Sequence, residues 1–294
     1  MLLTDSFLDY LRLERNYSEN TITGYQKDIL QLQGFLEERA GEVSLEEVDA
    51  DLIRDWVIRL LDDGYTTTSV NRKLSSLRTF YKYLLRRGEV TVNPLQKITG
   101  PKNEKPLPVF LREEDMDKLQ DRGLYGEGFE GCRDYLILEM FYATGMRLSE
   151  LIGLNDVDID FSLGVIKVTG KRNKQRLIPF GEELKLLMRE YVNNRDEEVP
   201  IHSEAFFVRK SGERLYPVIV RNIVKRNLSK VVTVKKRSPH VLRHTFATAM
   251  LNHGAALSSI KELLGHENLA TTEVYTHTTF EELKKVYNQA HPRA

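Results

Sequence analysis

The chain has 294 residues, 41% of them hydrophobic and 29% charged, and its 43 basic and 43 acidic side chains cancel to a formal net charge of zero. This composition excludes a mainly disordered chain, and the length favours two folded domains. No apolar run exceeds four residues, the first residues lack a signal-peptide pattern, and Cys132 is the only cysteine. We therefore expect a soluble cytoplasmic protein with no disulfide, no cysteine-based metal site and no membrane contact.

The N-terminal part is predicted to be entirely helical. Apolar residues at helical spacing predict one helix after Ser18 that runs to about Glu38 and a second over about 50–62. A third helix is predicted over about 68–87, and it ends before Gly88.

The third predicted helix carries basic and hydroxyl side chains on one face, with no acidic residue from Arg72 to Arg87. Such a face can lie along a DNA backbone or groove, although an ordinary solvated helix shows the same pattern. The candidate DNA-binding residues here are Arg72, Lys73, Arg78 and Lys82.

Prolines mark the domain boundary. Four of the nine prolines fall between Pro94 and Pro108, where they remove backbone donors and disfavour helix. We therefore predict an N-terminal domain over 1–88, a linker over 89–109 and a C-terminal domain over 110–294.

The C-terminal domain is predicted to be mostly helical with a small β-sheet. Two short strands over 165–168 and 176–178 flank a turn that starts at Gly170, and Ala205 to Val208 is predicted as a further strand. Helices are predicted near 131–143, 182–193, 217–229, 240–252, 256–264 and 280–289.

The charges are segregated along the chain, although they cancel overall. Residues 167–176 hold five basic side chains and no acid, and residues 209–243 hold eleven basic side chains against one acid. The acids gather instead over 37–63, where ten face three basic residues. Separate positive surfaces on a neutral molecule fit a phosphate-rich partner, although each run alone can be a solvated face. Arg172 and Lys174, within the first run, are further candidate DNA contacts.

Four side chains that could carry chemistry stand where helices begin or end. His240 and Arg243 lie three residues apart just after a proline, so both can face one phosphate. Arg147 follows the helix-breaking Gly145, and the carboxylate of Glu150 one turn later can orient its guanidinium group. Each residue taken singly has an ordinary structural explanation, such as capping or a surface ion pair.

No phosphate-binding loop or dinucleotide-binding motif is present in the sequence. His240 and His244 are spaced as a metal pair would be, but the accompanying Glu is missing. A metallohydrolase built on these two and His266 stays an alternative, which predicts that chelation abolishes activity.

Four C-terminal motifs together resemble the signatures of the tyrosine recombinases, and they occur in that family's order. They are ATGMRLSEL over 143–151, the hairpin from Gly170 to Pro179, PHVLRHTFAT over 239–248 and LLGHENLATTEVYTH over 263–277. YSENTITGY over 17–25 and NRKLSSLRTFY over 71–81 resemble the helical core-binding domain of the same family. In its length and in the absence of an extra arm-binding domain, the chain resembles the Xer subgroup.

The resemblance implies roles for six catalytic residues and for Glu150 beside them. Tyr275 would be the nucleophile that attacks the scissile phosphate and forms a 3′-phosphotyrosine bond. Arg147 and Arg243 would clamp the phosphate, His240 would be the general acid/base, and His266 would donate a hydrogen bond. Lys171 would protonate the departing 5′-oxygen, and the spacing alone does not separate it from Lys174. Glu150 would orient the arginines, and no metal or cofactor is required.

The resemblance also implies the fold and the task. It implies an all-α core-binding domain and a mainly α catalytic domain with a small sheet (α+β), which together form a C-shaped clamp on double-stranded DNA. The last helix resembles a segment that family members dock into a neighbouring subunit, although its apolar residues also suit packing within the chain. The expected assembly is a homo- or hetero-tetramer with a related recombinase, and a septal DNA translocase is a further candidate partner.

The leading hypothesis is a site-specific recombinase that resolves chromosome dimers before cell division. A mobile-element integrase or a DNA invertase would use the same chemistry, and a type IB topoisomerase would share the phosphotyrosine step. A DNA-binding regulator that never cuts is the alternative from a different class, and a denaturant-stable adduct with a nicked substrate would exclude it.

Overall fold

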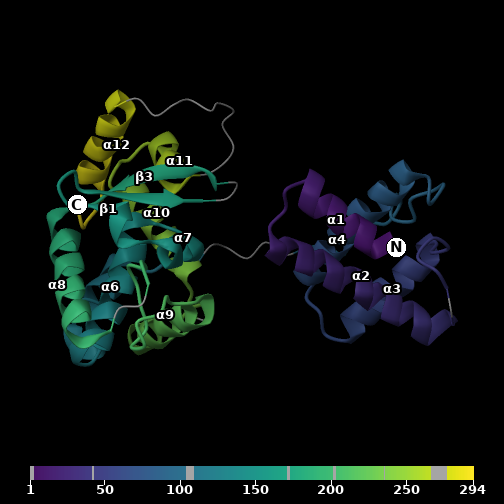
Figure 1. Cartoon of the computed structure of the whole chain (residues 1–294), viewed down its shortest axis with the longest axis horizontal. Coiled ribbons are helices and arrows are strands. Elements are labelled where there is room, and N and C mark those ends of the chain that lie inside the picture. Colours follow the sequence, from purple (N-terminus) through teal and green to yellow (C-terminus); the bar gives the residue numbers. More distant parts are fainter. Residues whose placement is uncertain are drawn as a thin grey trace. The chain divides into compact units, whose positions relative to one another are not determined.

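The computed structural model groups the chain into two compact units, Met1–Pro106 and Leu107–Ala294 (Figure 1). The helices dominate both units, and the one sheet of the described residues is small, so the predicted fold class is confirmed. No helix in the described part of the chain combines the length and apolar character that crossing a membrane requires. The structure describes residues 3–41, 43–103, 109–170, 173–200, 203–234, 236–265 and 277–294.

The first unit is a helical bundle around the buried ring of Trp56 and two clustered aromatic rings, Phe7 and Phe80. Two helices begin at side chains that accept hydrogen bonds from their first turns, Asp49 and Thr66. The three predicted helices are present, and an N-terminal helix was not predicted. The elements are α1 (Leu3–Asp9), a π-helical turn (Tyr10–Glu14), α2 (Glu19–Ala40), α3 (Ala50–Asp62) and α4 (Thr67–Arg87).

The segment after α4 packs onto the first unit, although the sequence predicted a linker over 89–109. Val90, Leu95 and Ile98 are buried in the core of this unit. The main-chain oxygen of Ile98 also accepts a hydrogen bond of 2.8 Å from Arg78. Apolar side chains between the prolines therefore dock this segment, and the predicted linker is too long at its N-terminal end.

The second unit is built around the buried helix α6, which packs against α8, α9 and α10 (Figure 1). Its sheet is antiparallel in the order β1-β2-β3, with Ile166 opposite Ile178. The helices are α5 (Glu113–Lys118), α6 (Gly128–Thr144), α7 (Leu148–Gly153), α8 (Glu182–Glu198), α9 (Pro217–Val231), α10 (Pro239–Asn252), α11 (Leu257–Leu264) and α12 (His277–Ala290). The strands are β1 (Ile159–Asp160), β2 (Val165–Thr169) and β3 (Gln175–Pro179).

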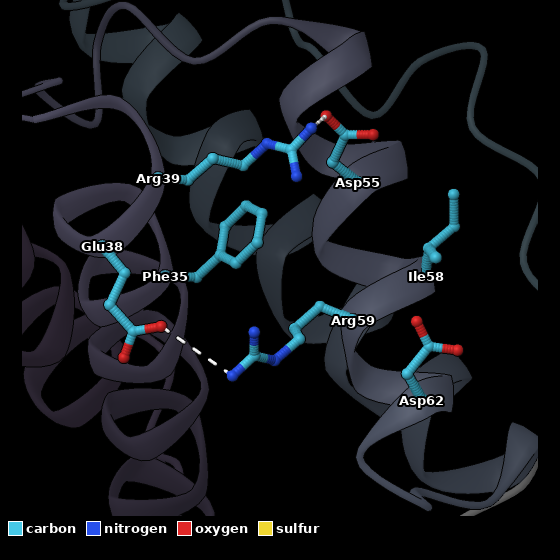
Figure 2. Close-up of a pocket in the computed structure, with 7 residues that line it drawn as sticks. All are labelled: Phe35, Glu38, Arg39, Asp55, Ile58, Arg59 and Asp62. Atoms are coloured by element: carbon cyan, nitrogen blue, oxygen red, sulfur yellow. Dashed lines mark ion pairs between the residues drawn. The ribbon is translucent and has the colours of Figure 1, made fainter.

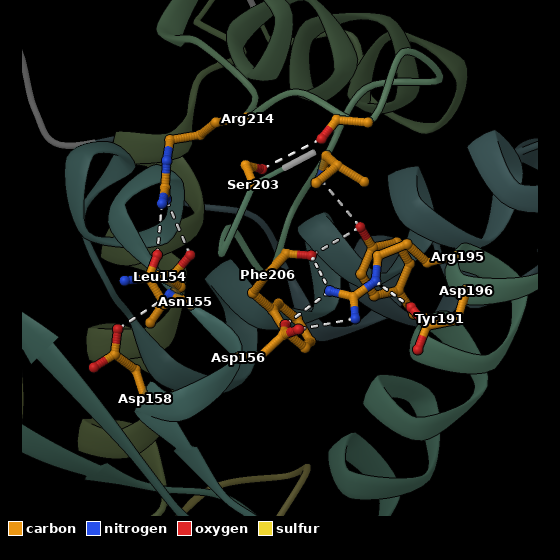
Figure 3. Close-up of polar contacts among 12 residues, drawn as sticks. Leu154, Asn155, Asp156, Asp158, Tyr191, Arg195, Asp196, Ser203, Phe206 and Arg214 are labelled. Carbon is orange, nitrogen blue, oxygen red and sulfur yellow. Dashed lines mark hydrogen bonds and ion pairs between the residues drawn. The ribbon is translucent and has the colours of Figure 1, made fainter. Parts of the chain in front are cut away.

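The predicted strand over Ala205–Val208 is wrong, because its two ends form only single bridges, to Asn155 and Arg214. Side chains supply part of the hydrogen bonding of this segment, as Figure 3 shows. The guanidinium group of Arg195 donates to the main-chain oxygen of Phe206 at 3.1 Å, and the hydroxyl of Tyr191 donates to the same oxygen at 3.0 Å. These bonds satisfy the carbonyl group of Phe206, whereas its N–H donates to the main-chain oxygen of Leu154 at 2.9 Å.

The last helix, α12, packs within the chain. Leu283 and Tyr287 are buried in one cluster with Phe246 and Met250 of α10. His291, just after the helix, stacks on the ring of Tyr287 with centroids 5.2 Å apart and an angle of 7° between the rings. Of the two arrangements that the sequence allowed for this helix, the single chain therefore adopts the intramolecular one.

Candidate active site

Arg147 and Glu150 are held together at the start of α7. Arg147 is the residue just before the helix, and its main-chain N–H donates to Oε2 of Glu150 at 2.7 Å. Its Nη1 donates to Oε1 of the same carboxylate, also at 2.7 Å. The Glu150 side chain is fully buried, whereas 29% of the Arg147 side chain is exposed. The guanidinium group is thus fixed on one side and open on the other.

Arg243 lies on α10 and bridges the ends of two other helices. Its Nη1 donates to the main-chain oxygen of Gly145 and its Nη2 to that of Leu264, each at 2.6 Å. Burial, followed by the positive charge of Arg147 and Arg176, lowers the pKa of Arg243 to about 10. The side chain therefore stays charged at neutral pH, and it is positioned by main-chain atoms.

Gly145 allows this arrangement because it adopts a backbone that other residues rarely adopt. Its φ is +58°, in the left-handed region, where it ends α6 and turns the chain toward Arg147. A Cβ at this position would lie 2.6 Å from a ring carbon of Phe246 and 2.8 Å from a methyl carbon of Leu264. The close approach of three segments therefore requires glycine.

Three consecutive carbonyl groups at the end of α11 each accept a hydrogen bond from a different arginine. Leu263 accepts from Nε of Arg176 at 2.9 Å, Leu264 accepts from Arg243, and Gly265 accepts from Nη2 of Arg147 at 2.7 Å. The last carbonyls of a helix lack partners within the helix and carry partial negative charge. This helix end therefore gathers three guanidinium groups from α7, β3 and α10 in one place.

His240 is exposed in the first turn of α10, one turn before Arg243. Partial burial of its ring, followed by the positive charges of Arg243, His244, Arg221 and Arg147, lowers the pKa of His240. The imidazole is therefore neutral at pH 7 and able to accept a proton.

Of the other site residues predicted in the second unit, the structure describes only Lys174. Lys174 is exposed in the connection between β2 and β3, where its main-chain oxygen accepts from the N–H of Gly170 at 2.7 Å. Lys171, Arg172, His266 and Tyr275 lie outside the described residues. Their roles stay predictions.

Arg176 is a residue of this site that the sequence analysis did not single out. Its side chain is 7% exposed, and its two terminal nitrogens donate to the two oxygens of Glu150 at 2.6 and 2.9 Å. No pattern in the sequence marks it, because the burial of Arg176 beside Ile178 on this short strand is visible only in the structure. A basic side chain at an inward strand position needs a buried partner.

Among the four candidate DNA-binding residues of α4, Lys73 is the exception. Its side chain is buried, and its ammonium group donates to Oδ1 of Asp28 at 3.0 Å. The helical spacing did not reveal this, because the partner lies on α2. Arg72 and Lys82 are exposed on α4, and Arg78 is partly exposed. The predicted contact between Lys73 and DNA is therefore withdrawn.

Two hollows in the described residues are lined by none of the site arginines Arg147, Arg176 and Arg243. One of about 380 Å³ lies between α2 and α3 of the first unit, where Arg39 pairs with Asp55 and Arg59 pairs with Glu38 (Figure 2). Another of about 350 Å³ lies beside Tyr142 and Thr245 in the second unit. Neither hollow is lined by a predicted catalytic residue.

The sequence of the chain matches the models of a known family. The model described as "Phage integrase family" matches residues 110–282, and the one described as "Phage integrase, N-terminal SAM-like domain" matches residues 4–88. The chain therefore belongs to the phage integrase family.

Curated relatives narrow the class. A protein named tyrosine recombinase XerC from Chlorobaculum parvum is 41% identical, over 99% of this chain and 94% of the relative. One of the same name from Staphylococcus aureus is 39% identical, over 99% of this chain and 97% of the relative. The chain is accordingly a site-specific tyrosine recombinase of the Xer subgroup, as the sequence motifs predicted.

Solved structures show the same fold. The XerH site-specific recombinase bound to a palindromic difH substrate matches with a TM-score of 0.73 at 22% identity, over 96% of this chain and 83% of that chain. The Tn1549 transposon integrase with a circular intermediate DNA matches with a TM-score of 0.74 at 20% identity, over 97% of this chain and 99% of that chain.

Proposed function

We propose that this recombinase cuts and rejoins double-stranded DNA through a 3′-phosphotyrosine bond to Tyr275, and that its task is to resolve chromosome dimers before cell division. The observation that carries the chemistry is the pair Arg147 and Arg243, each held by main-chain oxygens at 2.6–2.7 Å. The relatives named tyrosine recombinase XerC support the task.

The two arginines would bind the scissile phosphate before any bond changes. Their positions are set by carbonyl groups of helix ends, so little reorganisation is needed when negative charge builds on the phosphate oxygens. Guanidinium groups offer two parallel donors to a phosphate, which an ammonium group does not.

In the cleavage step, the phenol oxygen of Tyr275 attacks phosphorus and gives up its proton to neutral His240. The new bond joins the tyrosine oxygen to the 3′-phosphate, and the bond from phosphorus to the 5′-oxygen breaks. Lys171 protonates that 5′-oxygen as it leaves, and His266 donates a hydrogen bond to the phosphate. Rejoining reverses the step with a 5′-hydroxyl from the partner duplex, so the bond energy is kept and no metal or cofactor takes part.

The proposed assembly is a cytoplasmic tetramer on two DNA sites, formed by this chain alone or with a related recombinase. A septal DNA translocase is a further proposed partner. Phosphate contacts would come from Arg72, Arg78 and Lys82 of the first unit and from Arg172 and Lys174 of the second.

Covalent capture tests the chemistry and the task together. Sheared genomic DNA of the source organism is incubated with the protein in excess EDTA, adducts are isolated under denaturing conditions, and the attached DNA is sequenced. We expect adducts from one chromosomal locus; fragments that map to the ends of mobile elements would contradict the proposed task. Tyr275→Phe should bind the same DNA without forming an adduct, and an adduct in this variant would refute the proposed nucleophile.

A 5′-thiol leaving group tests the proton donor, because a thiolate leaves with little need for protonation. Lys171→Ala should cleave the ordinary substrate slowly and the 5′-thiol substrate at nearly the wild-type rate. Lys174→Ala is the matched control from the same hairpin. If only the Lys174 variant is rescued, the donor is Lys174.

A further inference from the structure

We propose that Arg176 is a positioning residue for cleavage, which acts through Glu150 to hold Arg147 toward the phosphate. This role rests on the proposed function. Arg176 lies in the hairpin motif, but the resemblance gave it no catalytic role. The observation that carries the proposal is that the Glu150 carboxylate lies between Arg147 and Arg176. Each of these two arginines also donates to a main-chain oxygen at the C-terminal end of α11.

The Glu150 carboxylate receives four hydrogen bonds, two from each arginine. Oε1 accepts from Nη1 of Arg147 at 2.7 Å and from Nη1 of Arg176 at 2.6 Å. Oε2 accepts from the main-chain N–H of Arg147 at 2.7 Å and from Nη2 of Arg176 at 2.9 Å. Arg176 thus grips both oxygens in a fork, and the carboxylate cannot turn without losing contacts to both partners.

The contacts of Arg176 indicate that it acts on Glu150. Its side chain is 7% exposed, and its Nε is bound to the main-chain oxygen of Leu263. Arg147, by contrast, has 29% of its side chain exposed. Because Nε and both terminal nitrogens of Arg176 are already bonded within the protein, we assign Arg176 to the support of Glu150.

The pKa of Glu150 supports the same role for Arg176. Burial alone would raise the pKa of Glu150, but the hydrogen bonds and charge of Arg176, followed by those of Arg147, lower it to about 2. Within the described residues, the charged groups that face this carboxylate are Arg147 just before α7, Arg176 from β3 and, farther away, Arg243 from α10. Without Arg176, the carboxylate keeps its burial but loses its strongest partner, so it protonates at a higher pH and releases Arg147.

Loss of Arg176 should therefore slow cleavage without weakening DNA binding. With a nicked duplex that contains the captured site, Arg176→Met should reduce the single-turnover cleavage rate about 10- to 100-fold, with the dissociation constant unchanged within about twofold. The acidic limb of the rate–pH profile should move to higher pH. Arg176→Lys keeps the charge but not the fork, so it should fold and still cleave more slowly than wild type.

A double-mutant cycle tests whether the effect passes through Glu150. Arg176→Met combined with Glu150→Gln should be no slower than the slower single variant, because both changes break the same chain of contacts. Rate reductions that multiply in the double variant would overturn the proposal.

Arg195 is a matched control in the same unit. It is equally buried, at 3% exposure, and it grips Asp156 in the same two-point manner at 2.7 and 2.9 Å (Figure 3). Arg195→Met should lower stability and leave the cleavage rate and its pH profile of the folded protein unchanged. If it slows cleavage as much as Arg176→Met does, the effect is general destabilisation and the proposal fails.

A readout without DNA separates this inference from the proposed function. In protein labelled with ¹³C at the glutamate carboxyl carbons, the Glu150 signal should show no titration between about pH 4 and 8 in wild type and should titrate within that range in Arg176→Met. An unchanged signal overturns the role of Arg176 even if DNA is cleaved. If wild type forms no adduct with any DNA while the signal shifts as expected, the proposed function fails and the coupling of Arg176 to Glu150 stands.

Discussion

Asp28→Asn should strongly destabilise the first unit, because it removes a buried charge that three side chains share. Asp28 is fully buried on α2, and its carboxylate accepts from Arg72 at 2.7 and 2.8 Å. It also accepts from Lys73 at 3.0 Å and from the hydroxyl of Ser76 at 2.7 Å. These contacts tie α2 to α4.

The expected cost follows from which partners are buried. The Lys73 side chain is 8% exposed, so without Asp28 its ammonium group is a buried charge with no counterion. Breaking such a pair costs about 3–5 kcal/mol, a large part of a typical stability of about 5–15 kcal/mol. The Arg72 side chain is 55% exposed, so Arg72→Ala leaves no unpaired buried cation and should cost less than Asp28→Asn.

The assay uses the single tryptophan of the chain, Trp56, which is buried in the first unit and therefore reports on that unit alone. Urea unfolding followed by its fluorescence in the full-length protein gives the free energy of unfolding of each variant. Asp51→Asn is the control, because Asp51 pairs with Arg54 at the surface with 81% of its side chain exposed. It should cost less than about 1 kcal/mol.

A second substitution and a pH series can refute the reasoning. Adding Lys73→Met to Asp28→Asn should recover part of the loss, since the unpaired charge is then gone. The hydrogen bonds from Arg72 and Ser76 and the charge of Lys73 outweigh burial and lower the pKa of Asp28, so its stabilisation is present above the unfolded pKa of about 3.9 and is lost as the pH falls further. An unchanged urea midpoint for Asp28→Asn at pH 7, or a double variant worse than the single one, would show that the buried pair does not hold these helices together.

Three further predictions concern the second unit and the DNA contacts. Gly145→Ala should lower the free energy of unfolding by more than about 1 kcal/mol and slow cleavage, because its Cβ would lie 2.6 Å from Phe246. Gly254→Ala is the control, because this residue has a φ of +86° and no atom within 4 Å of the added Cβ. It should lower the free energy of unfolding by about 1 kcal/mol without slowing cleavage. Burial lowers the pKa of His291 to about 3, so the stability of this unit should fall as the pH drops from about 6.5 toward 3, and His291→Phe should reduce that slope in pH-dependent unfolding followed by circular dichroism. Lys82→Ala should lower the slope of log affinity against log salt by about 0.9, and Lys73→Met should leave that slope unchanged; equal effects would place Lys73 on the DNA.

Three helices of the first unit and the family of the protein could be predicted from the sequence. Helical spacing predicted α2, α3 and α4, since apolar residues three and four apart can bury one face of a helix wherever it packs. The order of four short motifs predicted a tyrosine recombinase, and the family and curated relatives confirmed it. The contact between Arg147 and Glu150 also followed from spacing, because residues three apart at a helix start can meet.

Only the tertiary structure decided which charges are buried and which residues support the site. Lys73 lies among exposed basic residues in the sequence, but its partner Asp28 is 45 residues away. Arg176 meets Glu150 across 26 residues and the carbonyl group of Leu263 across 87. Docking of Val90, Leu95 and Ile98 likewise depends on a core formed by earlier helices. Burial and pairing of this kind arise from contacts between distant segments, and hydrophobic period and local motifs carry no information about them.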